Sequence, residues 1–173
     1  MNRHVTGSFD SVELGLFSSR IAAICEEMGA LLGRVAFSPN IRDRLDYSCA
    51  LFNSRGQLLG QATHIPVHLG SMAYAMVHLV ESRKWHAGDM LILNDPYKGG
   101  THLPDITLVA PVFDGDSLVG FCANRAHHAD IGSDAPGSMP VSRLLAEEGV
   151  LIAPTLLMKN AQLEEDFLQS LLK

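Results

Sequence analysis

Apolar residues recur at helical spacing in three segments of the chain. The first segment spans residues 10–36, where Asp10 can accept the first free backbone N–H groups and Pro39 stops helix growth shortly after the end. Two further segments, residues 71–82 and 160–172, each carry an apolar stripe on one side. The pattern therefore predicts three amphipathic helices.

Short runs rich in apolar and β-branched residues, bounded by turn-forming residues, predict strands. Six such runs are present, at residues 47–52, 57–62, 90–93, 106–113, 118–124 and 150–153. The first and second runs, and the fourth and fifth, are separated by four turn-forming residues, so each pair is expected to form a hairpin. Helices and strands do not alternate regularly, as they would in a doubly wound sheet. We expect a mixed α/β (α+β) fold, with a hairpin-based antiparallel sheet covered by two or three helices.

The length of the chain is sufficient for one domain. Its 173 residues can enclose a hydrophobic core, so residues 1–173 are treated as a single domain. The expected helix at residues 160–172 carries an apolar face with nothing after it to cover that face. We therefore expect the chain to be part of a larger protein or to bury this helix in a partner.

Composition narrows the class of protein. Apolar residues make up 47% and charged residues 18%, which is typical of a folded domain. The net charge is −6 and no basic stripe is present, so nucleic acid is not an expected partner. No apolar segment is long enough for a membrane span or a signal peptide, which favours a cytoplasmic protein. Cys25, Cys49 and Cys122 lie within apolar patterns and are expected to be buried free thiols.

The candidate chemistry lies in two polar segments that each follow a predicted strand. The segments are NDPYKGGTHLPD at residues 94–105, with Asp95, His102 and Asp105, and NRAHHADIGSDAPGS at residues 124–138, with His127, His128 and Asp130. Imidazole and carboxylate groups bind divalent metals or transfer protons near neutral pH. We expect these segments to form the two halves of one polar site.

Local geometry leaves two interpretations open for each half. The Leu-Pro pair between His102 and Asp105 favours two ligands that converge on one ion, although a rigid surface turn explains it equally well. Adjacent His127 and His128 point in opposite directions on extended backbone, so only one of them faces the site. Asp130 shares the direction of His128 and can act with it. Structural hydrogen bonding is the alternative role for all of these side chains.

Other polar residues are candidates for binding a substrate. His64 and His68 have the spacing of a helical metal pair, but the proline between them favours a loop that lines the site. Arg42 and Arg44, near Asp46, can form forked hydrogen bonds to a carboxylate or carbonyl group, and the alternative is a solvated turn. Glycine-rich phosphate-binding motifs are absent from the sequence, so this chain is not expected to bind a nucleotide.

Three long motifs in this order resemble the hydantoinase B/oxoprolinase family. They are SPNIRDRLDYSCALFNSRGQLLGQATHIPVHLGSM, NDPYKGGTHLPDITLVAPVF and ANRAHHADIGSDAPGSMP, and they span residues 38–140. The family includes B subunits of ATP-dependent hydantoinases and 5-oxoprolinases, and a large subunit of acetone and acetophenone carboxylases. Its members are several hundred residues long, so the resemblance implies that this chain corresponds to the N-terminal portion of such a protein.

The resemblance implies an enzyme that hydrolyses C–N bonds of cyclic amides or imides, such as lactams, hydantoins or 5-oxoproline. A hydantoinase A-type subunit, an actin-like ATPase, would bind ATP and activate the substrate, so a hetero-oligomer is expected. The resemblance is also compatible with a carboxylase-type large subunit that acts on a ketone. A truncated, non-catalytic assembly domain that docks an ATPase subunit, and a metallohydrolase that works without ATP, are two more hypotheses.

The resemblance also implies a divalent metal, manganese or zinc. Carried onto this sequence, the metal ligands would be His102, Asp105 and His127, with His128 as the alternative to His127. The expected general bases are Asp95, His128 and Asp130, and the expected substrate-binding residues are Arg42, Arg44, His64 and His68.

Overall fold

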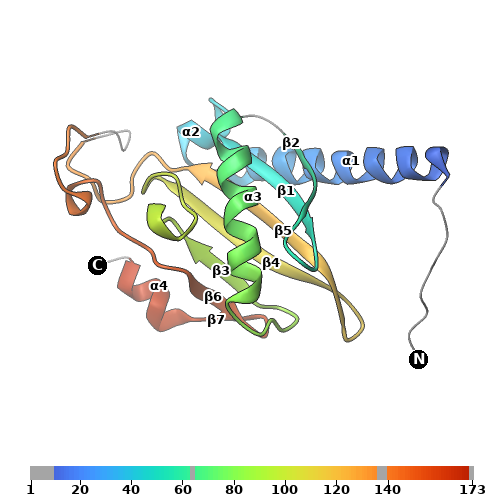
Figure 1. Cartoon of the computed structure of the whole chain (residues 1–173). Helices are drawn as coiled ribbons and strands as arrows, with labels where there is room; N and C mark the ends of the chain where they lie inside the picture. Colours follow the sequence, from blue (N-terminus) through green and yellow to red (C-terminus); the bar gives the residue numbers. More distant parts are fainter. Residues whose placement is uncertain (1–9, 63–64, 136–139, 172–173) are drawn as a thin grey trace.

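The computed structural model describes residues 10–62, 65–135 and 140–171, which form one seven-stranded sheet flanked by helices (Figure 1). The strands are β1 (Tyr47–Asn53), β2 (Leu58–Ala62), β3 (Met90–Leu93), β4 (Asp105–Asp114), β5 (Ser117–His127), β6 (Thr155–Lys159) and β7 (Gln162–Leu163). The helices are α1 (Ser11–Val35), α2 (Pro39–Arg42), α3 (Pro66–Glu81) and α4 (Glu165–Leu171), with 3-10 turns η1 (Pro96–Lys98) and η2 (Leu145–Glu147). The strand order is β2-β1-β5-β4-β3-β6-β7, and each neighbouring pair is antiparallel. The expected mixed α/β fold with a hairpin-based sheet is confirmed.

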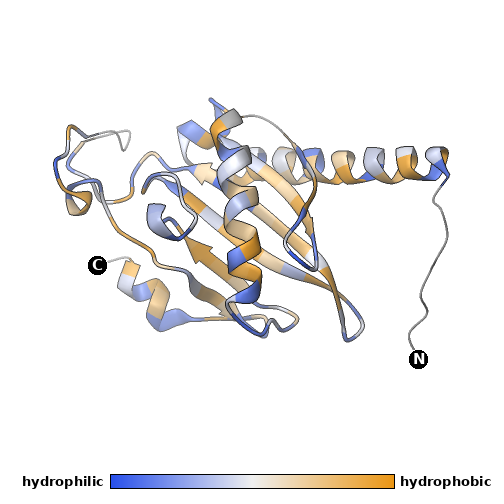
Figure 2. Ribbon diagram, in the orientation of Figure 1, coloured by the Kyte–Doolittle hydropathy of each residue, from blue (hydrophilic) through white to orange (hydrophobic). Residues whose placement is uncertain are grey.

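The core lies between α3 and one face of the sheet. Alternate residues of the central strands point to this face. The face is apolar over most of its length (Figure 2). The buried core residues are Ala50, Phe52, Met72, Ala75, Met76, Leu79, Trp85, Leu91, Leu93, Val109, Phe121 and Ala123. Because α3 supplies four of them, its apolar stripe determines how the helix docks on the sheet.

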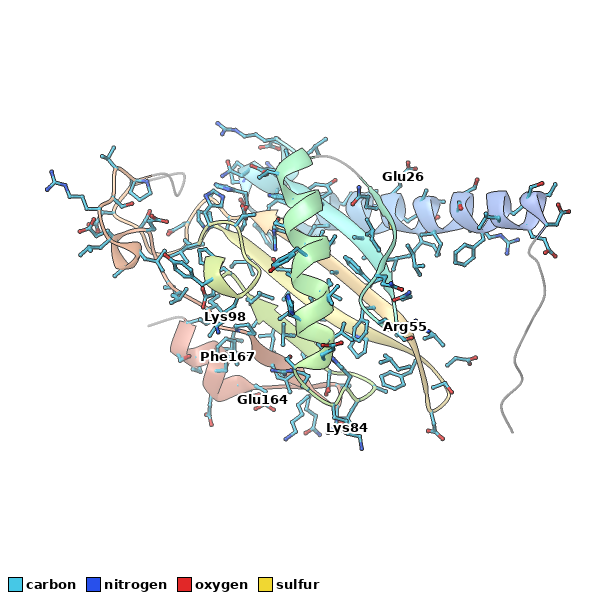
Figure 3. The ribbon with its side chains drawn as sticks, viewed as in Figure 1. Glu26, Arg55, Lys84, Lys98, Glu164 and Phe167 are labelled. Carbon is cyan, nitrogen blue, oxygen red and sulfur yellow. The ribbon has the colours of Figure 1, made fainter. Side chains whose placement is uncertain are left out.

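The opposite face of the sheet is covered by α1 and α2 near β1 and β2. A smaller cluster there joins Ile41, Tyr47, Cys49 and Ala126. A Cβ atom added to Gly60 would lie 2.5 Å from the side chain of Ile21, so glycine allows α1 to approach β2 closely. The first ten residues of α1 are all exposed. The N-terminal part of this helix extends beyond the sheet (Figure 3).

The start of α3 differs from the sequence prediction. We expected a loop up to residue 70 and a helix from residue 71, but α3 begins at Pro66 and includes His68 in its first turn. The backbone N–H groups in the first turn of a helix have no acceptor within the helix, so a proline there removes no helical hydrogen bond. The fixed φ of proline also suits that position. The proline therefore starts the helix rather than excluding it.

The C-terminal part also differs from the prediction. We expected a strand at residues 150–153 and a helix over 160–172, whereas the chain forms the β6–β7 hairpin and a short α4. Asn160 and Ala161 have φ values of 50° and 63°, which suits a two-residue hairpin turn. Residues 160 and 161 were expected to begin a helix, but they form the turn that connects β6 and β7.

The described residues contain no helix that is both long and apolar enough to span a membrane.

Candidate functional site

The carboxylate of Asp105 lies at the centre of a cluster of three histidines. Its Oδ1 atom is 2.9 Å from His102 Nε2 and 3.1 Å from His127 Nδ1. Its Oδ2 atom is 3.3 Å from His68 Nε2 and also accepts a hydrogen bond from the Thr101 hydroxyl. His102 Nε2 and His127 Nδ1 are 3.2 Å apart. The two polar segments identified in the sequence therefore meet in space.

Sheet register brings Asp105 and His127 together. Asp105 begins β4, His127 ends β5, and the two residues are directly opposite each other in the ladder. Both belong to the sheet face that packs against α3. At this end of that face the side chains change from apolar to polar, and α3 adds His68 from its first turn. The site is thus a polar continuation of the hydrophobic core.

His102 is placed by a tight loop between β3 and β4. The backbone N–H of Asp105 donates to the carbonyl of His102, which closes a turn around the Leu-Pro pair. Buried Asn94 donates to the carbonyls of Leu103 and Val150 and so ties this loop to the C-terminal segment. A Cβ atom on Gly100 would lie 2.2 Å from the carbonyl oxygen of Asn94, so the loop has no room for a larger residue there.

The electrostatic environment keeps Asp105 ionised. Burial on its own raises the pKa of the Asp105 carboxyl, but four hydrogen bonds to the charged form outweigh burial and hold the pKa well below its usual range. The donors are His102, His127, His68 and Thr101. An ionised carboxylate beside two imidazoles is the donor set expected for a divalent cation. The ligand atoms of His102, Asp105 and His127 all lie within 4.8 Å of one another.

A cavity of about 340 Å³ opens over the cluster. Its lining residues are Asn40, Arg44, Asp46, Ile65, Val67, His68, His102, Asp105 and His127. Asp46 precedes β1 and its Oδ1 atom is 4.0 Å from His68 Nε2, which brings a second carboxylate to the site. From the sequence, Asp46 was expected only as a neighbour of Arg42 and Arg44. The sequence did contain a signal for the direction of the Asp46 side chain. Every second residue of a strand points to the same face, and the positions that share this direction with Asp46 are Ser48, Ala50 and Phe52. The last two face the core.

His68 is held by a hydrogen bond on its other ring nitrogen. The Ser48 hydroxyl lies 3.2 Å from His68 Nδ1, and both groups are buried. If the hydroxyl donates to Nδ1, the proton of the neutral ring is on Nε2 and points at Asp105. His68 therefore supports Asp105 directly, which the expected loop position did not anticipate.

The three residues expected to act as general bases lie outside this cavity. His128 follows the pleat to the opposite face of the sheet, where it lines an apolar groove with Leu32 and Ile41. Burial lowers the pKa of His128, and nearby His127 lowers it further. Exposed Asp130 accepts the N–H of Gly132 within its own turn.

Asp95 and the two arginines also have identifiable positions. Buried Asp95 caps η1 by accepting the N–H of Tyr97. Exposed Arg42 forms an ion pair with Asp43 at 3.0 Å and does not line the cavity, whereas Arg44 does. His64 lies outside the described residues. Of the expected substrate-binding residues, Arg44 and His68 thus lie at the site.

The sequence matches known proteins over nearly its whole length. A profile of the hydantoinase B/oxoprolinase family matches residues 10–173. An uncharacterized protein of Methanocaldococcus jannaschii is 46% identical over 92% of this chain, and a 5-oxoprolinase of Dictyostelium discoideum is 42% identical over 95%. The matched region is 29% of the first relative and 13% of the second, so this chain spans less than a third of either protein.

Solved structures of related enzymes share the fold. The ATP-dependent caprolactamase from Pseudomonas jessenii superposes with a TM-score of 0.84 and 28% identity, covering 96% of this chain and 29% of that one. Acetone carboxylase in its nucleotide-free state gives a TM-score of 0.82 and 25% identity, covering 93% of this chain and 22% of that one. The profile match, the identities and the shared fold agree, and the chain belongs to the hydantoinase B/oxoprolinase family.

Proposed function

We propose that this chain supplies the metal-dependent site of an ATP-coupled hydrolase that opens a cyclic amide or imide. The observation that carries the proposal is the convergence of His102, Asp105 and His127 beneath an open cavity. Two imidazole nitrogens and an ionised carboxylate suit manganese or zinc. The family membership, with its relatives named 5-oxoprolinase, supports the reaction class.

The chain's own residues would orient the substrate and hold the metal-binding side chains in position. His102, Asp105 and His127 would hold a divalent cation, which would supply Lewis acidity toward a substrate oxygen or a water molecule. His68 holds Asp105 in place through its Nε2 atom. Arg44, which is exposed and lines the cavity, would bind an anionic group such as a carboxylate or phosphate.

ATP would act through a partner rather than through this chain. A lactam is resonance-stabilised, so transfer of a phosphoryl group to its carbonyl oxygen makes the C–N bond easier to cleave. We propose an actin-like ATPase of the hydantoinase A type as the partner that performs this transfer. Similarity to the ATP-dependent caprolactamase from Pseudomonas jessenii supports the proposed dependence on ATP.

A carboxylase-type large subunit is the second candidate. The nearly equal structural similarity to acetone carboxylase favours it, because both enzymes share this fold. In that case the same cluster would bind a ketone substrate. The hydrolase ranks first because the 5-oxoprolinases have a higher sequence identity to this chain than acetone carboxylase has.

Metal binding is the decisive test of the site. We expect the purified chain to bind one Mn²⁺ or Zn²⁺ ion in calorimetric titration, and His102→Ala or His127→Ala to weaken binding at least a hundredfold. His128→Gln is the matched control, because this neighbouring histidine lies on the other sheet face, and it should bind like the wild type. A chain that takes up no ion, or a loss in His128→Gln equal to that in His127→Ala, would refute the metal site.

Activity requires a second measurement with the ATPase partner present. We expect phosphate release and ring opening when lactams are supplied with ATP, and loss of ring opening in His102→Ala. Carboxylation of a ketone from bicarbonate, without ring opening, would favour the second candidate. A complex that forms without any metal or turnover would instead support a non-catalytic assembly domain.

A further inference from the structure

Arg125 is a fully buried cation directly behind the histidine–aspartate cluster. It lies on β5, and each part of its guanidinium donates to a different element. Nε donates to Thr107 Oγ1 at 2.7 Å, Nη1 to Ser71 Oγ at 2.6 Å and Nη2 to the Gly99 carbonyl at 2.6 Å. One side chain therefore connects β4, α3 and the loop between β3 and β4.

Each of these contacts lies close in sequence to a member of the cluster. Thr107 is two residues after Asp105 on the same face of β4. Ser71 is one helical turn after His68, and its hydroxyl also donates to the carbonyl of His68 at 3.3 Å.

The remaining two cluster members are tied in the same way. Gly99 is three residues before His102, and Arg125 itself is two residues before His127 on β5. The four side chains of the cluster, the carboxylate and its three histidines, thus come from four backbone segments joined by one guanidinium.

The chemistry of arginine suits this position. Its planar fork sends N–H groups in fixed, separate directions, whereas a lysine ammonium offers three donors around a single point. All three acceptors are uncharged, so burial of the cation is not offset by a hydrogen-bonded carboxylate among these contacts. A methionine of similar length would fill the volume with no hydrogen bonds. Without the guanidinium, the Thr107 and Ser71 hydroxyl groups and the Gly99 carbonyl would lose this shared donor.

We propose that Arg125 is the positioning residue of this site, which holds the loop bearing His102 and the first turn of α3 at the spacing that the cluster needs. The consequence for metal affinity rests on the proposed function, but the consequence for backbone order does not. Partners in the outer shell of a metal site typically change affinity about 10- to 100-fold when they are removed.

The test compares Arg125→Met and Arg125→Lys with two controls in the same chain. Val109→Ala removes core volume on β4 away from the polar cluster, and Arg83→Lys changes a half-buried arginine whose guanidinium lies 5.7 Å from the Trp85 ring. Hydrogen exchange should accelerate at least tenfold at residues 99–105 and 66–71 in both Arg125 variants. Val109→Ala should lower thermal stability without this local pattern.

A second readout measures the metal. The Kd for Mn²⁺ should rise at least tenfold in Arg125→Met and Arg125→Lys and stay within about twofold of wild type in both controls. In Arg125→Ala, millimolar guanidinium should restore affinity while the same concentration of ammonium does not, because only guanidinium reproduces the planar fork. A role in folding alone would not give this selective rescue.

The outcomes separate the two proposals. A wild-type chain that binds no metal refutes the metal site, and local hydrogen exchange still decides the role of Arg125. If Arg125→Lys keeps wild-type exchange at residues 99–105, the positioning role is wrong whether or not metal binds. If the Arg125 variants do not fold, Ser71→Ala and Thr107→Val each remove one acceptor, and normal loop exchange in both would overturn the proposal.

Discussion

Adjacent His127 and His128 have opposite environments, although they are chemically identical. His127 faces Asp105 on the α3 side of the sheet, and His128 faces an apolar groove on the other side. Burial lowers the pKa of His128, because it disfavours the charged form of the ring. The pleat of β5 assigns these environments, because side-chain direction reverses at each residue of a strand.

The cysteines lead to a prediction at the same scale. Cys25 and Cys49 are buried and Cys122 is half-buried, all three as free thiols. Burial raises the pKa of all three thiols, that of Cys49 to about 12. Because the reactive species is the thiolate, raised pKa values mean little reaction at pH 8. We expect slow labelling by Ellman's reagent in the native protein and rapid labelling of three thiols in denaturant. If one thiol in the native protein reacts at the rate of free cysteine, the prediction is wrong.

At the scale of elements, the loop between β3 and β4 determines where His102 lies in the site. Gly100→Ala would place a methyl group against the Asn94 carbonyl and push the loop outward. We expect at least a tenfold weaker Kd for Mn²⁺ with α-helix content unchanged in circular dichroism. Gly70→Ala is the control, because a Cβ there meets nothing within 4 Å. Equal metal affinity in the two variants would show that the loop tolerates the displacement.

Asn94 joins this loop to the segment before β6, so it should matter for stability. Its side chain donates to the Leu103 and Val150 carbonyls and accepts the N–H of Ile152 at 2.6 Å. Asn94→Ala removes these partners from buried groups, which should lower the free energy of unfolding by about 2–4 kcal/mol. Urea denaturation measures the change, and half-buried Asn124→Ala should lose clearly less. Similar losses in both variants would contradict the role of Asn94.

Sequence patterns located most elements, but they misplaced the start of α3, predicted a strand at residues 150–153 that does not form, and missed the β6–β7 hairpin. Helix α1, strand β3 and the β1–β2 and β4–β5 hairpins follow from periodicity and turn residues, and they were predicted within a few residues. The start of α3 at Pro66 and the hairpin turn at Asn160 were not. In both places the local signal suits two conformations, and packing against the sheet selects one of them.

At the scale of the whole molecule, α1 is unevenly supported. Residues 11–20 are all exposed and include the large apolar side chains of Leu14, Leu16 and Phe17, whereas later turns pack on β1 and β2. An unsupported helix segment of this length is marginal in water, because helical stability in proteins derives mainly from tertiary packing.

We therefore expect rapid hydrogen exchange over residues 11–20 and slow exchange over residues 21–35 in the isolated chain. Asp10→Ala should destabilise the first turn by about 1 kcal/mol, because the Asp10 side chain accepts the N–H of Val12. Mass spectrometry of peptides from the two halves of α1 gives both measurements. Equal protection of both halves would show that the exposed half is stabilised in another way.

The sequence was sufficient to define the elements with strong periodicity and the residue types of the candidate site. The two polar segments that contain His102, Asp105 and the His127–His128 pair could be located from the sequence, because residue type and strand ends are local properties, whereas the choice of His127 over His128 rested on the family resemblance. Which groups meet depends on the tertiary structure: the β4–β5 register set Asp105 opposite His127, and the docking of α3 added His68. These choices depend on hydrogen bonds and core packing between residues far apart in the chain, and local periodicity carries no information about such pairs.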